Sequence, residues 1–324
     1  MPTRQTSPPT RRIFKLTIAA LCMLDRLMVY GSRDKGADTG LLTLGFLILL
    51  LVFISSSDVL EESQTQEEVA ASSIVPDGAL LLFRLSCVVL VVITLSWIAL
   101  DPKGSKDYPL FFKDREIRRR DVVGPTRLAA FTMWHFALIG ITFATSGYAT
   151  WIHMSGGEVP EWILLASPIL FSTAFACAIL VTCVITFHII GDNQRKGNPI
   201  DHLFSWYEIV MHNVNVAIMA ISLILNDMNV EWKYFVFPAV FGIVYVFWAA
   251  IYANFISGVF IYEFMDYRMA GAPVIYFILF VLQISFFFVV LALDRLAEWN
   301  IVVGFVTAMG MTWAISALKE PVHG

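Results

Sequence analysis

The sequence predicts an all-α fold, a polytopic transmembrane helix bundle of about eight spans. The chain has 324 residues, of which 58% are hydrophobic and only 15% are charged. A soluble domain of this length carries more charge than that. Apolar runs of the length that a bilayer requires recur along most of the chain. The composition therefore indicates an integral membrane protein.

Eight segments are expected to cross the membrane, at residues 41–57, 79–99, 128–152, 163–190, 206–226, 234–256, 273–293 and 299–317. The first is short, and the last two are so close in the chain that we expect a tight helical hairpin. An earlier apolar stretch, "IFKLTIAALCMLDRLMVYG", contains Asp25 and Arg26. Because these charges interrupt it, we expect that stretch to lie in the membrane interface and not to cross.

The charges of the connecting segments predict the orientation. Residues 1–40 and 100–127 are rich in Lys and Arg, whereas residues 58–78 and 153–161 contain neither. About 19 basic residues fall on one side of the predicted topology and about two on the other, and the basic side is normally cytosolic. Both termini are therefore expected in the cytosol, in a protein of the endoplasmic reticulum or the plasma membrane.

Two of the expected helices carry a stripe of polar side chains. Glu208, His212 and Asn215 follow the i, i+4, i+7 spacing, which places them on one side of a helix. Another helix has such a stripe in Thr132, His135, Ile139, Thr142 and Ser146. Polar groups in hydrocarbon are costly and normally face the bundle interior. We therefore expect the two stripes to face each other and to line a polar pocket near the cytosolic surface.

Nucleophilic catalysis is one interpretation of these stripes. With the predicted topology, Thr132 and His212 differ in depth by only ~3 Å. A Thr hydroxyl becomes a nucleophile when an adjacent base such as His takes its proton. Glu208, one turn from His212, would then orient the imidazole. A purely structural interpretation stands beside this one, because the same side chains can hydrogen-bond the helices to one another.

Three other classes fit the sequence less well. His135, His188, His202 and His212, with Glu208 or Asp192, could bind iron or zinc, but HxxxH and HxxHH clusters are absent. We therefore predict no metal and no cofactor. Charged residues well inside the spans are few, which argues against a transporter. The run "REIRRR" is interleaved with acidic residues, so we interpret it as a topology determinant and expect no nucleic-acid partner.

Three passages carry a resemblance to a known family. They are "LAAFTMWHFALIGITF", "IVMHNVNVAIMAISLIL" and "FGIVYVFWAAIYANFISGVFIYEFMD", the last a Gly-x-x-Tyr span that closes on a Tyr and an acidic residue. In their order and spacing, residues 79–293 resemble the androgen-induced protein family, which includes the androgen-dependent regulator of tissue factor pathway inhibitor and the insect rolling stone protein. The resemblance implies six spans. Some members of the family are threonine hydrolases that cleave fatty acid esters of hydroxy fatty acids, so the resemblance also implies this activity.

The family's catalytic Thr and His fall on Thr132 and His212. The chain then divides into a basic N-terminal segment (1–40), an extra span with an acidic loop (41–78), the six-span core (79–293) and a C-terminal span with a short tail (294–324). The motif "HNVN" is closer to the rolling stone branch, to which hydrolase activity carries over less securely.

The preferred prediction is thus a lipid-ester hydrolase with membrane lipids as partners and a fatty acyl ester as substrate. Thr132 would attack, and His212 would act as general base and then as general acid. Asn213, Asn215 and His135 are candidate oxyanion donors. The alternative is a non-enzymatic membrane protein, a receptor-like or adhesion and fusion component, and a transporter comes third. Protein partners are not predicted.

Overall fold

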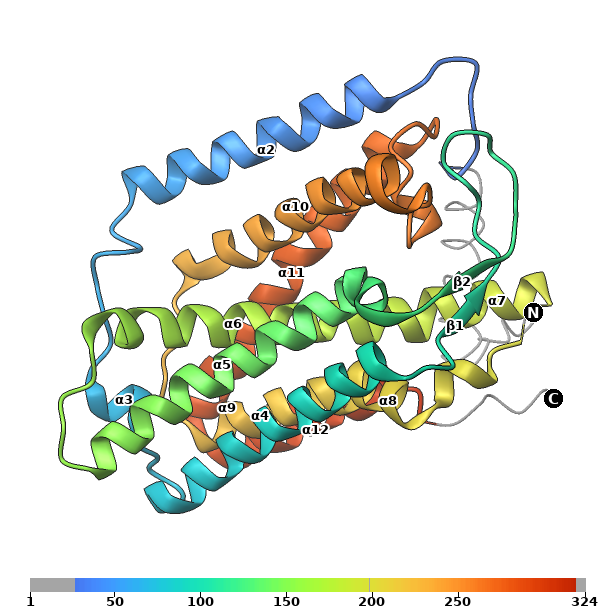
Figure 1. Cartoon of the computed structure of the whole chain (residues 1–324). Helices are drawn as coiled ribbons and strands as arrows, with labels where there is room; N and C mark the ends of the chain where they lie inside the picture. The colour runs from blue at the N-terminus through green and yellow to red at the C-terminus, as the bar shows by residue number, and fades with distance from the viewer. Residues whose placement is uncertain (1–26, 198, 319–324) are drawn as a thin grey trace, which may run out of the picture.

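The computed structural model describes residues 27–197 and 199–318 and is a bundle of helices (Figure 1). The apolar stretch predicted to lie in the interface falls almost wholly outside the described residues. In the described part, six helices are long and apolar enough to cross a membrane: Gly36–Ser56, Asp77–Leu100, Glu161–Arg195, Trp206–Leu225, Trp232–Ser257 and Ala272–Trp299. The protein is therefore a mostly helical, multi-span membrane protein.

All eight predicted spans fall on helices, but two of these helices do not qualify as candidate spans. Helix α5 (Phe131–Met154) is long enough, yet its buried His, Thr and Ser side chains make it more polar than the others. Helix α12 (Ile301–Ile315) is apolar but has only 15 residues. The predicted count of eight spans is thus not confirmed. A span in the bundle interior does not have to be uniformly apolar, so the polarity of α5 does not by itself exclude it as a span.

The long helices are joined by short elements. α2 (Gly36–Ser56), α3 (Gln66–Ala70) and α4 (Asp77–Leu100) precede a two-stranded antiparallel hairpin of β1 (Ser105–Asp107) and β2 (Arg120–Val122), in which Lys106 pairs with Asp121. After a 3-10 turn (Gly124–Ala129) come α5 and then α6 (Glu161–Cys183), α7 (Ile190–Lys196), α8 (Trp206–Ile209), α9 (Asn215–Leu225), α10 (Val236–Ile251), α11 (Ala272–Trp299) and α12.

Three of the spans change to π-helical turns near one end of the bundle. These turns are Val184–Ile189 between α6 and α7, Val210–Val214 between α8 and α9, and Tyr252–Ser257 after α10. Each inserts an extra residue per turn and rotates the side chains that follow it, and such turns are frequent at functional sites. All three lie around the region that holds Thr132 and His212.

Helix α6 runs through the middle of the bundle, and α2 lies at its outer edge beside α10 and α11 (Figure 1). Small side chains in "STAFACA" bring the neighbouring helices close to α6, and every residue from Phe171 to Thr182 is buried there. The largest core cluster gathers Phe136, Phe143, Phe171, Phe175 and Phe287. Stacking of Phe46 on Phe280, with ring centroids 4.1 Å apart, fixes α2 to α11.

The helical hairpin expected at the C-terminal end is confirmed. α11 ends at Trp299, and α12 begins two residues later and packs against it. The Asn300 side chain caps α12 by accepting hydrogen bonds from the amides of Val302 and Val303. A Cβ on Gly304 would lie 2.5 Å from the Cα of Ala297, so only glycine allows the two helices to approach this closely.

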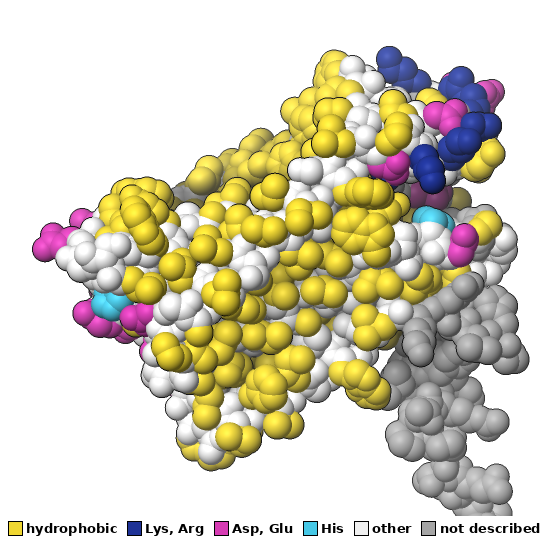
Figure 2. All heavy atoms as spheres, turned by 60° about the horizontal axis from the view of Figure 1, so that its bottom comes forward, with side chains coloured by type: hydrophobic (Ala, Val, Ile, Leu, Met, Phe, Trp, Pro, Cys, Tyr) yellow, Lys and Arg dark blue, Asp and Glu magenta, His cyan; other side chains and the backbone are white. Residues whose placement is uncertain are grey.

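Charged side chains separate to the two ends of the bundle (Figure 2). The end with β1 and β2 exposes Lys103, Lys106, Lys113, Arg115, Arg118 and Arg119. The opposite end, which holds α3, exposes Glu61, Glu62 and Glu67 together with Glu158 and Glu161. We call these the basic end and the acidic end. That the basic end faces the cytosol stays a prediction from the charge rule.

Candidate functional site

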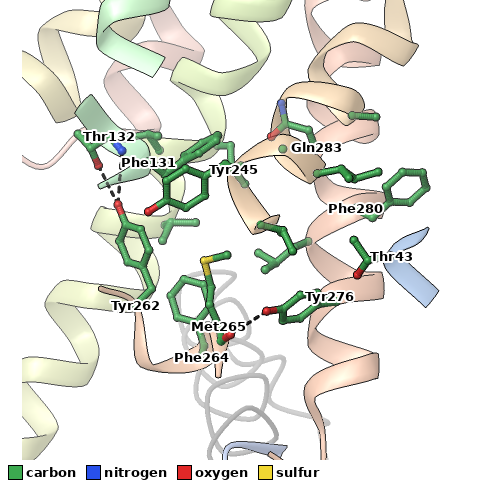
Figure 3. Close-up of a pocket in the computed structure, with 18 of the residues that line it drawn as sticks. Thr43, Phe131, Thr132, Tyr245, Tyr262, Phe264, Met265, Tyr276, Phe280 and Gln283 are labelled. Atoms are coloured by element: carbon green, nitrogen blue, oxygen red, sulfur yellow. Dashed lines mark hydrogen bonds between the residues drawn. The ribbon is translucent and has the colours of Figure 1, made fainter. Parts of the chain in front are cut away.

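An apolar pocket lies between α2, α5, α6, α10, α11 and the loop 258–271 (Figure 3). It contains about 890 Å³ of empty space, counting the open part of its mouth. Its wall is almost entirely aliphatic and aromatic. The polar side chains in the wall are Thr43, Thr132, Tyr245, Tyr262, Tyr276 and Gln283. A lining of this kind, apolar with a few polar groups, is typical of a site for an apolar ligand.

Thr132 lies in the first turn of α5, at the pocket wall. The indole of Trp248 donates to the carbonyl of Ala129 and holds the start of the helix in place. Amides in a first turn have no acceptor within the helix. The amide of Thr132 instead donates to the hydroxyl of Tyr262 at 3.4 Å, and the Thr132 Oγ1 lies 3.3 Å from that same oxygen. Thr132 is therefore presented to the pocket beside a tyrosine.

The two polar stripes meet at His135 and Asn215, as expected. His135 Nδ1 lies 2.8 Å from the carbonyl of Thr132, so Nδ1 carries the proton. The Nδ2 of Asn215 then donates to His135 Nε2 at 3.1 Å, and Thr182 Oγ1 donates to the Asn215 Oδ1. These bonds join α5, α6 and α9 and use both nitrogens of the imidazole. Neither side chain therefore faces the pocket as an oxyanion donor.

Asn213 has a different partner. Its Oδ1 accepts a hydrogen bond from the amide of Ala317 at 2.8 Å, and its Nδ2 donates to the carbonyl of the same residue at 3.2 Å. The amide thus clamps the backbone that follows α12 onto the start of α9. The sequence suggested Asn213 as an oxyanion donor, whereas in the structure its side chain is hydrogen-bonded to the backbone of Ala317.

Replacing Asn213 with Ala should release the segment after α12. We expect hydrogen exchange at the Ala317 amide to become several-fold faster, because one hydrogen bond contributes about 1 kcal/mol. Exchange measured by mass spectrometry on peptides that cover residues 310–318 tests this. Asn229→Ala, at the acidic end, is the matched control and should leave this exchange unchanged. Equal protection in wild type and Asn213→Ala would show that packing alone holds the segment.

His212 lies in the π-helical turn between α8 and α9 and is buried. Its Nδ1 is 3.2 Å from Glu208 Oε2, which agrees with the pairing that the i, i+4 spacing predicts. The carboxylate does not lie along the N–H direction, so Nδ1 has no directed hydrogen-bond partner. Within residues 27–197 and 199–318, no hydrogen bond joins His212 to Thr132.

The prediction of a polar pocket between the two stripes is wrong. The pocket is apolar, and of the two stripes only Thr132 reaches its wall. The physical reason is the bond between His135 and Asn215, which closes the space between the stripes. Thr132, at the end of its stripe, is turned instead towards α10 and the loop 258–271.

Tyr245 and Tyr262 are pocket residues that the sequence analysis did not assign. Both lie in "FGIVYVFWAAIYANFISGVFIYEFMD", and Tyr245 is the Tyr of its Gly-x-x-Tyr pattern. A polar aromatic residue inside an apolar span was the available signal for Tyr245, whereas Tyr262 follows that span in the chain. Burial raises the pKa of Tyr262, and the negative charge of Glu208 also raises it. The phenol of Tyr262 therefore stays protonated.

The histidines considered as metal ligands do not come together. Among the residues that the structure describes, no group of three or more His, Cys, Asp or Glu side chains gathers in a way that could hold a metal ion. His135 and His212 are instead engaged in the contacts given above. Cys87 and Cys177 are buried, and no disulfide is formed by the cysteines of the described part.

Comparison with known proteins finds no match: no family model fits the chain, and no curated protein or solved structure is significantly similar to it. The resemblance to the androgen-induced protein family therefore stays a hypothesis. The fold and the site define only the class of protein. It is a multi-span helical membrane protein with an apolar pocket beside Thr132.

Proposed function

We propose that this protein is a membrane-embedded lipid-ester hydrolase, with Thr132 as nucleophile and an acyl chain as the occupant of the pocket. The observation that carries the proposal is the position of Thr132. Its side chain lies in the wall of an apolar pocket inside a membrane protein. Acyl chains suit such a wall, because apolar surface leaves water when they bind. A fatty acid ester of a hydroxy fatty acid is the substrate that the family resemblance suggests.

The proposed reaction has two steps. The Thr132 Oγ bonds to the ester carbonyl carbon while His212 takes the hydroxyl proton, and the alcohol leaves with that proton, so an acyl-threonine remains. A water molecule then attacks the acyl group. Its proton passes through His212 to Thr132 Oγ, and a fatty acid is released. Because no direct bond joins His212 to Thr132, the proposal requires a bridging water or a rotation of one side chain.

A non-enzymatic role is the second candidate, and a specific observation favours it. His135, Asn215 and Thr182 form a closed network between helices, and Asn213 clamps the backbone at Ala317. Most of the polar stripe thus has structural partners. In that case the protein would bind a lipid without cleaving it, as a receptor-like or adhesion component. Either protein would reside in the endoplasmic reticulum or the plasma membrane, with both termini in the cytosol.

Covalent labelling by a long-chain fluorophosphonate in membranes separates the two candidates. We expect wild type to label, and Thr132→Ala and His212→Ala to lose labelling at matched expression. Thr142→Ala is the control, because Thr142 is a buried threonine of the same helix whose hydroxyl donates to Leu138. It should label like wild type. Absence of labelling in wild type, or equal labelling of Thr132→Ala, would favour the non-enzymatic candidate.

A further inference from the structure

Three hydroxyl oxygens gather at one side of the pocket (Figure 3). They belong to Thr132 in α5, Tyr262 in the loop after α10, and Tyr245 in α10. The rings of Tyr245 and Tyr262 are 6.4 Å apart between centroids, and the hydroxyl of Tyr245 points towards the other two. We call these three side chains the hydroxyl cluster. It is a polar spot in a wall that is otherwise mostly apolar.

The hydroxyl proton of Tyr245 has no acceptor within residues 27–197 and 199–318, although the side chain is only 2% exposed. A buried hydroxyl without a partner is costly, and native structures rarely leave one unpaired. Phe131 and Trp134 pack against its ring, so the ring cannot easily turn away. A donor fixed in this way at a pocket wall is suited to an acceptor on a bound ligand.

The start of α5 adds a second reason to expect an acceptor here. The amide of Thr132 has no partner within its helix and donates to the oxygen of Tyr262. Because that oxygen already accepts a hydrogen bond, the proton of Tyr262 is free to be donated to Thr132 or to a ligand. The N-terminus of a helix also favours partial negative charge close to it. Tyr245, Tyr262 and this helix end therefore converge on one place.

We propose that Tyr245 and Tyr262 donate hydrogen bonds to the carbonyl oxygen of a lipid ester whose acyl chain fills the pocket. The binding part of this inference stands alone, whereas its catalytic part rests on the proposed function. As the Thr132 Oγ bonds to the carbonyl carbon, the carbonyl oxygen gains negative charge, and donors fixed in advance stabilise that charge. The two phenols thus take the role for which the sequence suggested Asn213, Asn215 and His135.

The kinetic test uses variants that remove only the phenol oxygens. Tyr245→Phe and Tyr262→Phe should each lower kcat for a long-chain ester by about tenfold or more with little change in KM, since oxyanion donors act in the transition state. Tyr234→Phe is the matched control, because Tyr234 is also a buried phenol without a hydrogen-bond partner in the part of the chain that the structure describes, and it does not line the pocket. Unchanged kcat in both pocket variants would overturn the catalytic part.

A binding test separates this inference from the hydrolase proposal. Infrared difference spectra of 1-13C methyl palmitate bound to Thr132→Ala protein report hydrogen bonding to the carbonyl without turnover. We expect a carbonyl stretch lowered in frequency, which returns towards the value in hydrocarbon when Tyr245→Phe or Tyr262→Phe is added. The same frequency with and without the phenols would overturn the inference, even if wild type hydrolyses esters. Tighter binding of palmitate than of its methyl ester would also overturn it, by assigning the phenols to a carboxylate.

Discussion

Thr132→Ala should lower the rate of ester cleavage by about 10³-fold or more, because a hydrolysis that proceeds through an acyl-enzyme stops without its nucleophile. The substitution removes one hydroxyl and one methyl group at the pocket wall. The hydrogen bond between the Thr132 amide and Tyr262 uses the backbone and survives the change. The fold is therefore expected to persist, and the loss should appear in kcat and not in folding.

Two companion variants sharpen the test. Thr132→Ser keeps the hydroxyl and should retain a measurable part of the activity. Thr142→Ala, in the same helix, should retain nearly all of it. Release of fatty acid from a long-chain ester in detergent micelles is the measurement, with thermal unfolding of each variant as the check on folding. Activity of Thr132→Ala within about twofold of wild type would exclude Thr132 as nucleophile.

Helix positions were predictable because burial in a bilayer demands apolar runs, and those runs are visible in the sequence. The segment predicted at 163–190 lies within Glu161–Arg195, and the segment at 273–293 lies within Ala272–Trp299. The ends were less accurate, since helices continue beyond the apolar run into polar residues such as Arg295. The strands β1 and β2 have three residues each, too few for an alternating pattern to be recognised.

The site was only half predictable. Helical spacing placed Glu208 beside His212 and brought the stripe of Asn215 to that of His135, because these relations depend on geometry within or between regular helices. The pocket depends instead on how the loop 258–271 folds back over α5, and no periodicity describes a loop. The contact of Tyr262 with Thr132 spans 130 residues of sequence, so no local pattern could reveal it.

The environment of Arg84 was likewise not predictable from the sequence, because three separate elements form it. Its side chain is 1% exposed in the first half of α4. One terminal nitrogen, Nη1, shares its two protons among three acceptors, the carbonyls of Val69 and Ser146 and the hydroxyl of Thr150, at 3.0, 2.9 and 2.5 Å. The guanidinium thus ties the end of α3 to α4 and α5, at the half of the bundle nearer the acidic end.

The remaining donors of Arg84 work against this stabilisation. Nε and Nη2 are buried without partners in the described residues, and a buried charge without a bonded counter-charge is costly. Hydrogen bonds from a charged group contribute about 1.5–3 kcal/mol each, and truncation to Ala adds a cavity. We expect the bonds and the packing together to outweigh the cost of the unpaired donors. The net effect of removing the side chain is therefore a loss of stability and not a gain.

Arg84→Ala is accordingly expected to lower the free energy of unfolding by about 3 kcal/mol, among the larger effects of a single substitution. Arg84→Met, which keeps most of the volume and removes the charge, should lose about half as much, because the carbonyl of Val69 still loses its donor. Thermal unfolding in detergent, followed with a thiol-reactive dye, reports the exposure of the buried Cys87 and Cys177. If Arg84→Ala were as stable as wild type, the cost of burying the charge would equal all that its hydrogen bonds and packing contribute.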